Sequence, residues 1–542
     1  MRLVKPIVLT AAATLMLAGC GSSKVISNSV ETLGPTMVEK KAELADPQLK
    51  QWNKLDEVAD TVPGMSVNKA YTDILKGRKS TTVIVGVVDS GVDIDHEDLK
   101  NIIWTNKGEI PNNGIDDDHN GFIDDVHGWN FLGDVVNENL ELVRMLKKGD
   151  DGSAAYKQAK KEYDQQLEEA KSNSARYEQI LKILEPAHEL IKKETGKEKY
   201  TKEDVENIKQ DDIKTLQAKD IVSRMLSYGQ PIEEVLGQLR EGIKYFNDQL
   251  KYNLNMDFDG RKVLNDDPDS MDEKVYGNNI VYGPDKEEAK HGTHVAGIIA
   301  AQRNNGIGTD GVANNVKILV VRAVPNGDEY DKDVALGIRY AVDNGAKVIN
   351  TSFGKYYSPH TDWVLDAIKY AAKHDVLIVN AAGNDSENID TKQVYPNDAI
   401  GDNPEIADNF LTVGALDVNN GPKMVASYSN YGKKNVDVFA PGSQIWSTTP
   451  NNHYEFLQGT SMASPAVAGV AAVIREYFPT LTASQVKKVI MDSGLAPKVT
   501  VELTNQETGE TTEKSFADLS KSGKIVNLYN ALILASKLAN SK

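Results

Sequence analysis

The sequence predicts an α/β protein built on a doubly wound, mostly parallel β-sheet. The first observation is a set of short, continuous apolar runs rich in β-branched residues, as buried parallel strands are; they cover residues 82–88, 316–321, 348–350, 376–379 and 410–413. The second is that stretches with helical spacing, such as 333–344 and 362–373, alternate with these runs. The third is a composition of 40% hydrophobic and 26% charged residues, which is typical of a folded, soluble chain.

Length and charge exclude several classes of protein. At roughly 100–200 residues per domain, 542 residues allow two to four domains or one large elaborated domain. The 79 acidic residues outnumber the 61 Lys and Arg residues, which gives a net charge of −18 and argues against nucleic acid as a partner. A single cysteine excludes an intramolecular disulfide and zinc sites of the Cys₄ or Cys₂His₂ type.

The N-terminus has the pattern of a signal peptide over residues 1–19. A short cationic start precedes an apolar run over residues 7–19, which is too short for a bilayer core that takes roughly 20 apolar residues. The Leu-Ala-Gly-Cys sequence that ends at Cys20 resembles the lipobox of bacterial lipoproteins. This resemblance implies cleavage before Cys20, lipidation of its thiol, and attachment to a bacterial membrane through a tether over residues 20–51. The alternative is an ordinary secretory signal with an incidental cysteine.

An acidic loop at residues 113–125 follows the first predicted strand. Acidic and Asn side chains alternate in it like the first ligands of a calcium loop, and Gly121 supplies a turn. The candidate ligands of a structural calcium ion are Asp116, Asp118, Asn120, Phe122 through its carbonyl, Asp124 and Asp125. His127 stands where an EF-hand has its bidentate glutamate, so the loop is not an EF-hand. The alternative is a solvated acidic turn.

A long segment of about 120 residues, from 133 to 252, interrupts the alternation of strands and helices. It contains no strand-like run, its charge is dense, and its apolar residues fall at helical spacing. We therefore expect a helical insertion within a folded domain that covers residues 52–542.

Three motifs carry the chemistry, and they occur in a fixed order along the chain. The first strand ends in Asp-Ser-Gly at residues 89–91, His-Gly-Thr-His-Val-Ala-Gly follows at 291–297, and Gly-Thr-Ser-Met-Ala-Ser-Pro follows at 459–465. Together they resemble the three signatures of subtilisin-like serine proteases, in the subtilisin order Asp, His, Ser. The resemblance covers about residues 52 to 535, apart from the helical insertion, and implies a subtilisin-like fold.

The resemblance also implies a role for each residue of the triad. Ser461 is the nucleophile, His291 the general base and later acid, and Asp89 the carboxylate that orients the imidazole. Ser461 opens an apolar helix, where free backbone N–H groups favour developing negative charge. Taken singly, Asp89 could cap a turn and Ser461 could cap a helix. His294 shares the second motif, but the family pattern assigns catalysis to His291.

Further site residues follow from the same resemblance. Asn384, at the end of an Asn-Ala-Ala-Gly-Asn segment, takes the role of the side-chain donor to the oxyanion. The predicted contacts to the backbone and first side chain of an extended substrate are Ser352, Phe353, Gly354, Ala381, Ala382 and Gly383. The small residues among them could instead serve only close packing of the sheet.

These observations predict an extracytoplasmic, lipid-anchored or secreted serine endopeptidase that acts on proteins or peptides. The alternative, from another class, is a catalytically silent, tethered peptide-binding module on the same fold. Only about 30 residues lie between Cys20 and the segment that begins near Trp52, which is too few for the usual pro-domain of the family. The sequence does not predict the cleavage preference or the oligomeric state.

Overall fold

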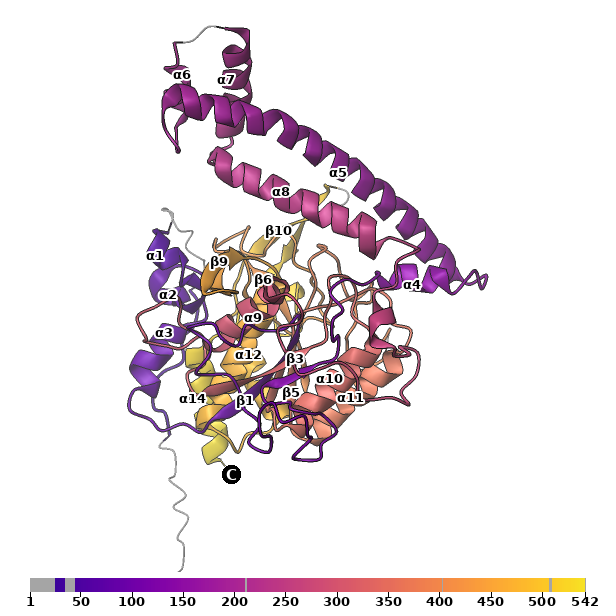
Figure 1. Ribbon diagram of the computed structural model, residues 1–542. Coiled ribbons are helices and arrows are strands. Elements are labelled where there is room, and N and C mark those ends of the chain that lie inside the picture. The colour runs from indigo at the N-terminus through magenta and orange to yellow at the C-terminus, as the bar shows by residue number, and fades with distance from the viewer. Residues whose placement is uncertain (1–24, 35–43, 210–211, 402, 506–508, 542) are drawn as a thin grey trace, which may run out of the picture.

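The centre of the protein is a seven-stranded sheet in which all paired strands are parallel (Figure 1). The computed structural model describes residues 25–34, 44–209, 212–401, 403–505 and 509–541. The strand order is β2-β3-β1-β4-β5-β6-β7. The strands are β1 (Val83–Asp89), β2 (Gly128–Asn130), β3 (Val316–Arg322), β4 (Val348–Thr351), β5 (Leu377–Ala381), β6 (Phe410–Leu416) and β7 (Val438–Pro441). The predicted α/β class is confirmed, and each of the five apolar runs forms a strand.

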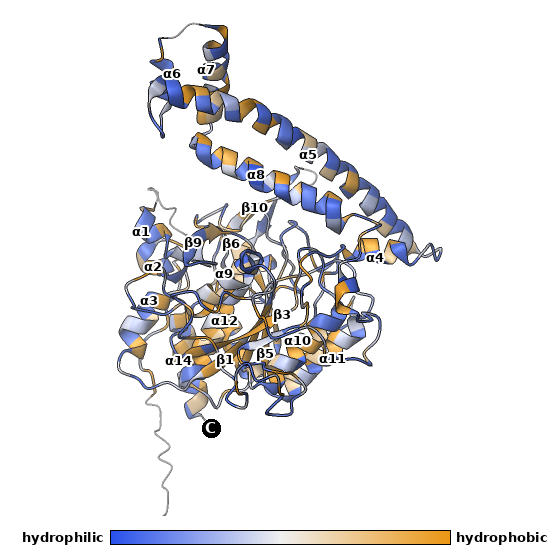
Figure 2. Ribbon diagram, in the orientation of Figure 1, coloured by the Kyte–Doolittle hydropathy of each residue, from blue (hydrophilic) through white to orange (hydrophobic). Residues whose placement is uncertain are grey.

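Helices cover both faces of this sheet, which explains why its strands are apolar throughout. One face packs against α9 (Lys290–Ala300), α12 (Thr460–Tyr477), α13 (Ala483–Ser493) and α14 (Leu528–Asn540). The other face packs against α10 (Asp331–Asp343) and α11 (Thr361–Lys373). Figure 2 shows the hydrophobic residues concentrated in the sheet and in α12, which lies in the middle of the molecule.

Short elements surround this core. The short α-helices are α1 (Asp46–Leu49), α2 (Glu57–Asp60) and α3 (Val67–Ala70). Two antiparallel hairpins are β8 (Ile445–Thr449) with β9 (His453–Leu457), and β10 (Thr500–Thr504) with β11 (Thr511–Ser515). Single turns of 3₁₀- or π-helix are η1 (Trp52–Lys54), η2 (Tyr71–Leu75), η3 (Gln249–Asn253), η4 (Arg261–Leu264), η5 (Lys286–Ala289) and η6 (Phe516–Asp518).

The expected insertion is an arm of helices that projects from the core (Figure 1). We call α4 to α8 the helical arm; its helices are α4 (Glu141–Lys147), α5 (Ala154–Thr195), α6 (Lys202–Glu206), α7 (Ile213–Leu226) and α8 (Ile232–Asp248). The side chain of Ser153 caps the start of α5, and Gly196 ends it in the left-handed conformation. The apolar stripes of α5, α7 and α8 form a separate small core. We call the part of the arm that contains this core the outer arm; it is stabilised by its own packing.

Part of the segment expected to be a tether packs against the folded domain. Ile26 is only 2% exposed, and its backbone N–H donates to Ser536 Oγ of α14 at 2.8 Å. Glu31 and Asn530 exchange two hydrogen bonds between side chain and backbone. Cys20 lies outside the described residues. Within the ranges described, no helix combines the length and the apolar character needed to cross a membrane.

Candidate active site

The three motifs meet at the carboxyl edge of the sheet. Asp89 is the last residue of β1, His291 lies in the first turn of α9, and Ser461 lies in the first turn of α12. A Cβ atom on Gly292 would collide with the carbonyl oxygen of Gly91. Gly292 therefore allows α9 to approach the end of β1 closely enough for His291 to bond Asp89.

The imidazole of His291 is held by Asp89. Its Nδ1 lies 2.6 Å from Asp89 Oδ1, and that carboxylate is 1% exposed. The same oxygen accepts the backbone N–H of Ser90 at 2.7 Å. Burial alone would lower the pKa of His291, but the charge of Asp89 and the hydrogen bond to it outweigh burial, so the pKa is raised above its ordinary value. The pair fixes Nδ1 as the protonated nitrogen and leaves Nε2 to accept a proton.

Ser461 makes a reciprocal pair of hydrogen bonds with Ser352. Ser461 Oγ donates to the carbonyl oxygen of Ser352 at 3.0 Å, and Ser352 Oγ donates to the carbonyl oxygen of Ser461 at 3.0 Å. Ser461 is thus placed beside the segment that we predicted to bind substrate. Within the part of the chain that the structure describes, Ser461 Oγ bonds Ser352 and makes no hydrogen bond with His291.

His294, the second histidine of the motif, has a structural role. It is fully buried, and its Nε2 bonds the carbonyl oxygens of Ile445 and Glu455 at 3.0 and 3.1 Å. Burial lowers its pKa to about 3, so the ring is neutral at physiological pH. His294 therefore ties α9 to the β8–β9 hairpin and is not available to Ser461.

Asn384 lies beside the start of α12, with its amide oriented by Thr460. Asn384 Oδ1 accepts the backbone N–H of Thr460 at 2.8 Å and its hydroxyl at 3.0 Å. Because both bonds use the oxygen, Nδ2 is the group left to donate. Thr460 is a positioning residue that our sequence reasoning missed, although the Gly-Thr-Ser motif contained it.

The predicted substrate contacts lie in different environments. Ser352 lines a cavity together with His291. Ala381 and Ala382 are 3% and 1% exposed, and Ala381 pairs with Val413 in the sheet. Their small size therefore serves close packing of the sheet. The remaining predicted contacts are Phe353, which packs partly buried against the α10–α11 side of the core, exposed Gly354, and Gly383, whose N–H donates to Thr460 Oγ1.

The acidic loop brings together a different set of carboxylates from the one we predicted. Glu109, Asp118 and Asp125 offer oxygens that all lie within 4.8 Å of one another. Asp116 and Asp124 are not part of this cluster, and their carboxylates accept backbone N–H groups of the loop. The remaining predicted ligands are Asn120, whose amide donates to Asp118 and Asp125, and Phe122, whose ring packs on Trp129 and Tyr340. Our prediction omitted Glu109 because it precedes the alternating pattern.

Fold and site together define a class of protein: an α/β protein with an aspartate, a histidine and a serine at the carboxyl edge of a parallel sheet. Residues 80–517 match the sequence profile of the subtilase family of peptidases. The chain therefore belongs to the subtilase family.

Individual relatives match parts of the chain. It is 44% identical over 185 residues to a thermophilic serine proteinase of Bacillus sp. strain AK1, which covers 34% of this chain and 42% of the relative. It is 40% identical to subtilisin DY of Bacillus licheniformis over 36% of this chain and 67% of the relative. It is 42% identical to thermitase of Thermoactinomyces vulgaris over 34% of this chain and 60% of the relative.

Proposed function

We propose that the chain is a serine endopeptidase that hydrolyses peptide bonds of proteins or peptides through an acyl-enzyme on Ser461. The observation that carries this proposal is the hydrogen bond between His291 Nδ1 and buried Asp89. Ser461 at the start of α12 bonds Ser352, which lines a cavity together with His291. The relative that is named a thermophilic serine proteinase supports it. A peptide-binding module would have no need of a paired histidine or an oriented amide donor.

The residues supply each step of acyl transfer. Ser461 Oγ attacks the carbonyl carbon while its proton passes to His291 Nε2, and Asp89 stabilises the imidazolium that forms. The Asn384 Nδ2 amide and the free backbone N–H groups at the start of α12 stabilise the oxyanion. The imidazolium then protonates the leaving amine. A water molecule, deprotonated by His291, hydrolyses the acyl-enzyme.

The direct test is covalent labelling by a fluorophosphonate, which reacts only with an activated serine. We expect one label per chain, located on Ser461 by peptide mapping, and we expect protonation of His291 at acidic pH to slow labelling. A protein that binds peptides but takes no label would favour the silent module instead.

We further propose that the mature chain is anchored outside the cytoplasm by lipid on Cys20. The support is the Leu-Ala-Gly-Cys sequence after an apolar run. Cys20→Ser is expected to move the protein from the membrane fraction to the soluble fraction without changing kcat, because the chain contains no other thiol. Membrane association that persists in this variant after a high-salt wash would contradict the anchor.

A structural calcium ion at Glu109, Asp118 and Asp125 is a further proposal. Three carboxylates whose oxygens lie within 4.8 Å provide the hard oxygen donors that calcium prefers. Burial raises the pKa of Asp125 to about 6, with a contribution from the charge of Asp118. A cation in this cluster would remove the repulsion among the carboxylates and would fix the loop that leads into β2.

Calcium is therefore expected to raise the unfolding temperature by a few degrees. At a hundredfold excess over Kd, a cation that binds only the folded state adds about 2.7 kcal/mol. Asp118→Asn is expected to remove most of this gain, whereas Asp116→Asn, whose side chain closes a turn, is expected to keep it. Each variant is compared with itself in calcium and in chelator. Equal melting curves of the wild-type protein in both would contradict the site.

A further inference from the structure

The helical arm lies over the face of the core that carries the candidate active site. Figure 1 shows α8 between α5 and the core. A cavity of about 420 Å³ has His291 and Ser352 on one side and four residues of α8 on the other. The α8 residues are Glu241, Lys244, Tyr245 and Asp248. Helix α8 is thus a wall of the same space that contains the proposed general base.

The first half of α5 forms a second wall. A cavity of about 670 Å³ is bounded by Asn384, Asp385 and Tyr356 of the core and by α5. The α5 residues are Gln158, Lys161, Glu162, Gln165, Gln166 and Glu169. The two cavities border the two proposed catalytic groups, the histidine and the oxyanion donor. The arm therefore spans the site instead of touching one edge of it.

Tyr245 is the large aromatic residue that α8 contributes to the His291 cavity. Its side chain lines the His291 cavity and is 58% exposed, and its hydroxyl accepts the amide of Gln249 at 2.9 Å. A large aromatic side chain that is held in place yet has free surface is suited to contact a bound polypeptide.

Contacts with the core hold this part of the arm in position. Asn326 donates to Asp248 at 3.4 Å, and Tyr357 donates to Glu162 at 2.7 Å. An apolar cluster that joins α4, the first half of α5 and Leu254 packs against Tyr357. The base of the arm is therefore packed on the core through apolar and polar contacts.

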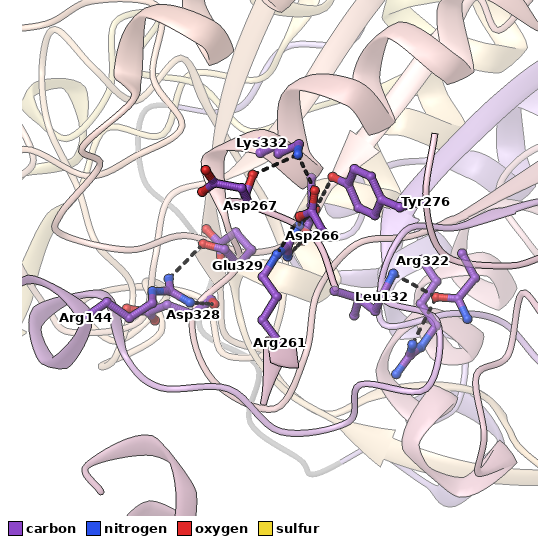
Figure 3. A network of polar contacts seen from close by, with 12 residues as sticks. Leu132, Arg144, Arg261, Asp266, Asp267, Tyr276, Arg322, Asp328, Glu329 and Lys332 are labelled. Carbon is purple, nitrogen blue, oxygen red and sulfur yellow. Dashed lines mark hydrogen bonds and ion pairs between the residues drawn. The ribbon is translucent and has the colours of Figure 1, made fainter. Parts of the chain in front are cut away.

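A buried charge network also joins the arm to the substrate side of the site. Lys355, directly after the predicted substrate segment, is 2% exposed along its side chain and lies 2.9 Å from Glu141 of α4. Arg144 of the same helix bonds Glu141 and the backbone of the 328–329 loop. Figure 3 shows the adjoining contacts, which include Arg144, Arg261, Asp266, Tyr276, Asp328, Glu329 and Lys332. Removal of one partner would leave a buried charge unpaired, so the base of the arm is fixed.

From these contacts we infer that α8 and the first half of α5 form a fixed roof over the substrate cleft. The protease therefore takes its substrate as one extended, unfolded segment of polypeptide. Tyr245 determines specificity by contacting that segment. An extended chain paired along one strand edge is thin enough to pass beneath a helix, whereas the body of a folded protein would collide with α8 and α5. The inference rests on the proposed endopeptidase activity.

Substrates of different length distinguish contacts with the roof from catalysis at the scissile bond. The test compares a chromogenic amide of a single acylated residue with peptides lengthened one residue at a time on either side of the scissile bond. Alanine is a strong helix former, so Tyr245→Ala should leave α8 intact. The change is expected to lower kcat/KM for the longer peptides by about tenfold, mainly through KM, because an aromatic contact with the substrate is lost. The single-residue amide is expected to change less than about twofold, because it does not reach the roof.

The matched control is Tyr228→Ala, a tyrosine of the same arm that is 81% exposed; it should leave both substrates unchanged. Tyr245→Trp should shift the preference toward smaller substrate side chains, whereas Tyr245→Ala should shift it toward larger ones. If Tyr245→Ala alters the single-residue amide as strongly as the long peptides, or alters neither, the specificity role is wrong. If the wild-type protein has no activity on the single-residue amide, the proposed function is contradicted instead.

A second measurement tests the roof itself. A disulfide-bonded protein is digested in its native form and after reduction and carboxymethylation. Replacing residues 154–248 with a Gly/Ser linker is expected to raise the rate on the native form relative to the unfolded form by about tenfold or more, since the variant no longer excludes folded chains. Retained activity on the single-residue amide shows that the variant has folded. An unchanged ratio of the rates on the native and unfolded forms, in an active variant, would overturn the roof. If the variant fails to fold, the inference is decided by the peptide kinetics of Tyr245→Ala and Tyr245→Trp.

Discussion

Ser461→Ala is expected to lower kcat for peptide hydrolysis by roughly 10⁴-fold or more, because no other group replaces the nucleophile that forms the acyl-enzyme. The loss should appear in kcat and not in KM, since the hydroxyl bonds the protein and not the ground-state substrate. The measurement is steady-state kinetics on a short fluorogenic peptide, with fluorophosphonate labelling of the same preparation.

The fold should survive this change. Ser461 is only partly buried, and its hydroxyl makes one bond, to the Ser352 carbonyl, so the free energy of unfolding should fall by about 1 kcal/mol or less. His291→Ala should cost a similar factor in kcat, and the double variant little more, because the triad acts as a unit. Turnover near the wild-type value in Ser461→Ala would refute the mechanism.

Asn384→Ala is expected to lower kcat by about 10²- to 10³-fold with little change in KM. The side-chain amide gains a strong partner only when the carbonyl oxygen becomes an oxyanion, so its loss raises the barrier without weakening ground-state binding. The structure makes the prediction specific to the nitrogen, because Thr460 already uses the oxygen.

Two further variants check this assignment. Asn384→Asp keeps the acceptor for Thr460 but removes the donor, and it should lose at least as much activity as Asn384→Ala. Thr460→Val keeps the shape and the backbone N–H bond to Asn384 but removes the hydroxyl bond, so the amide is held less firmly, and the change should cost about tenfold, as expected for a positioning residue. If KM alone rose in Asn384→Ala, the residue would bind substrate and would not stabilise the oxyanion.

The sequence predicted five of the seven strands of the central sheet, whereas the short strands β2 and β7 were not predicted. Strands buried on both faces must be apolar along their whole length, so they stand out as continuous runs such as 82–88 and 316–321. The residues that follow such strands collect at one edge of the sheet. The strand end makes Asp89 a residue to inspect, but the roles of Asp89, His291 and Ser461 came from the resemblance of their motifs to those of subtilisin-like proteases.

Contacts between distant parts of the chain were not visible in the same way. Glu109 joins Asp118 and Asp125 because the loop folds back, not because of any spacing between them. The bond between Ser461 and Ser352 joins residues 109 positions apart. Ile26 looked like part of a polar tether because its partner, Ser536 of α14, lies 510 residues away.

The sequence by itself determined that a helical insertion exists and that it separates Asp89 from His291, because a 3.6-residue apolar period is a local property. Only the tertiary structure decided where those helices lie. Their stripes could have packed on each other alone, as the outer arm does. The base of the arm is instead held by contacts with the core. Lys355 pairs with buried Glu141, and Tyr357 packs against α4 and α5. Such contacts depend on three-dimensional complementarity between segments far apart in the chain, which no local pattern records.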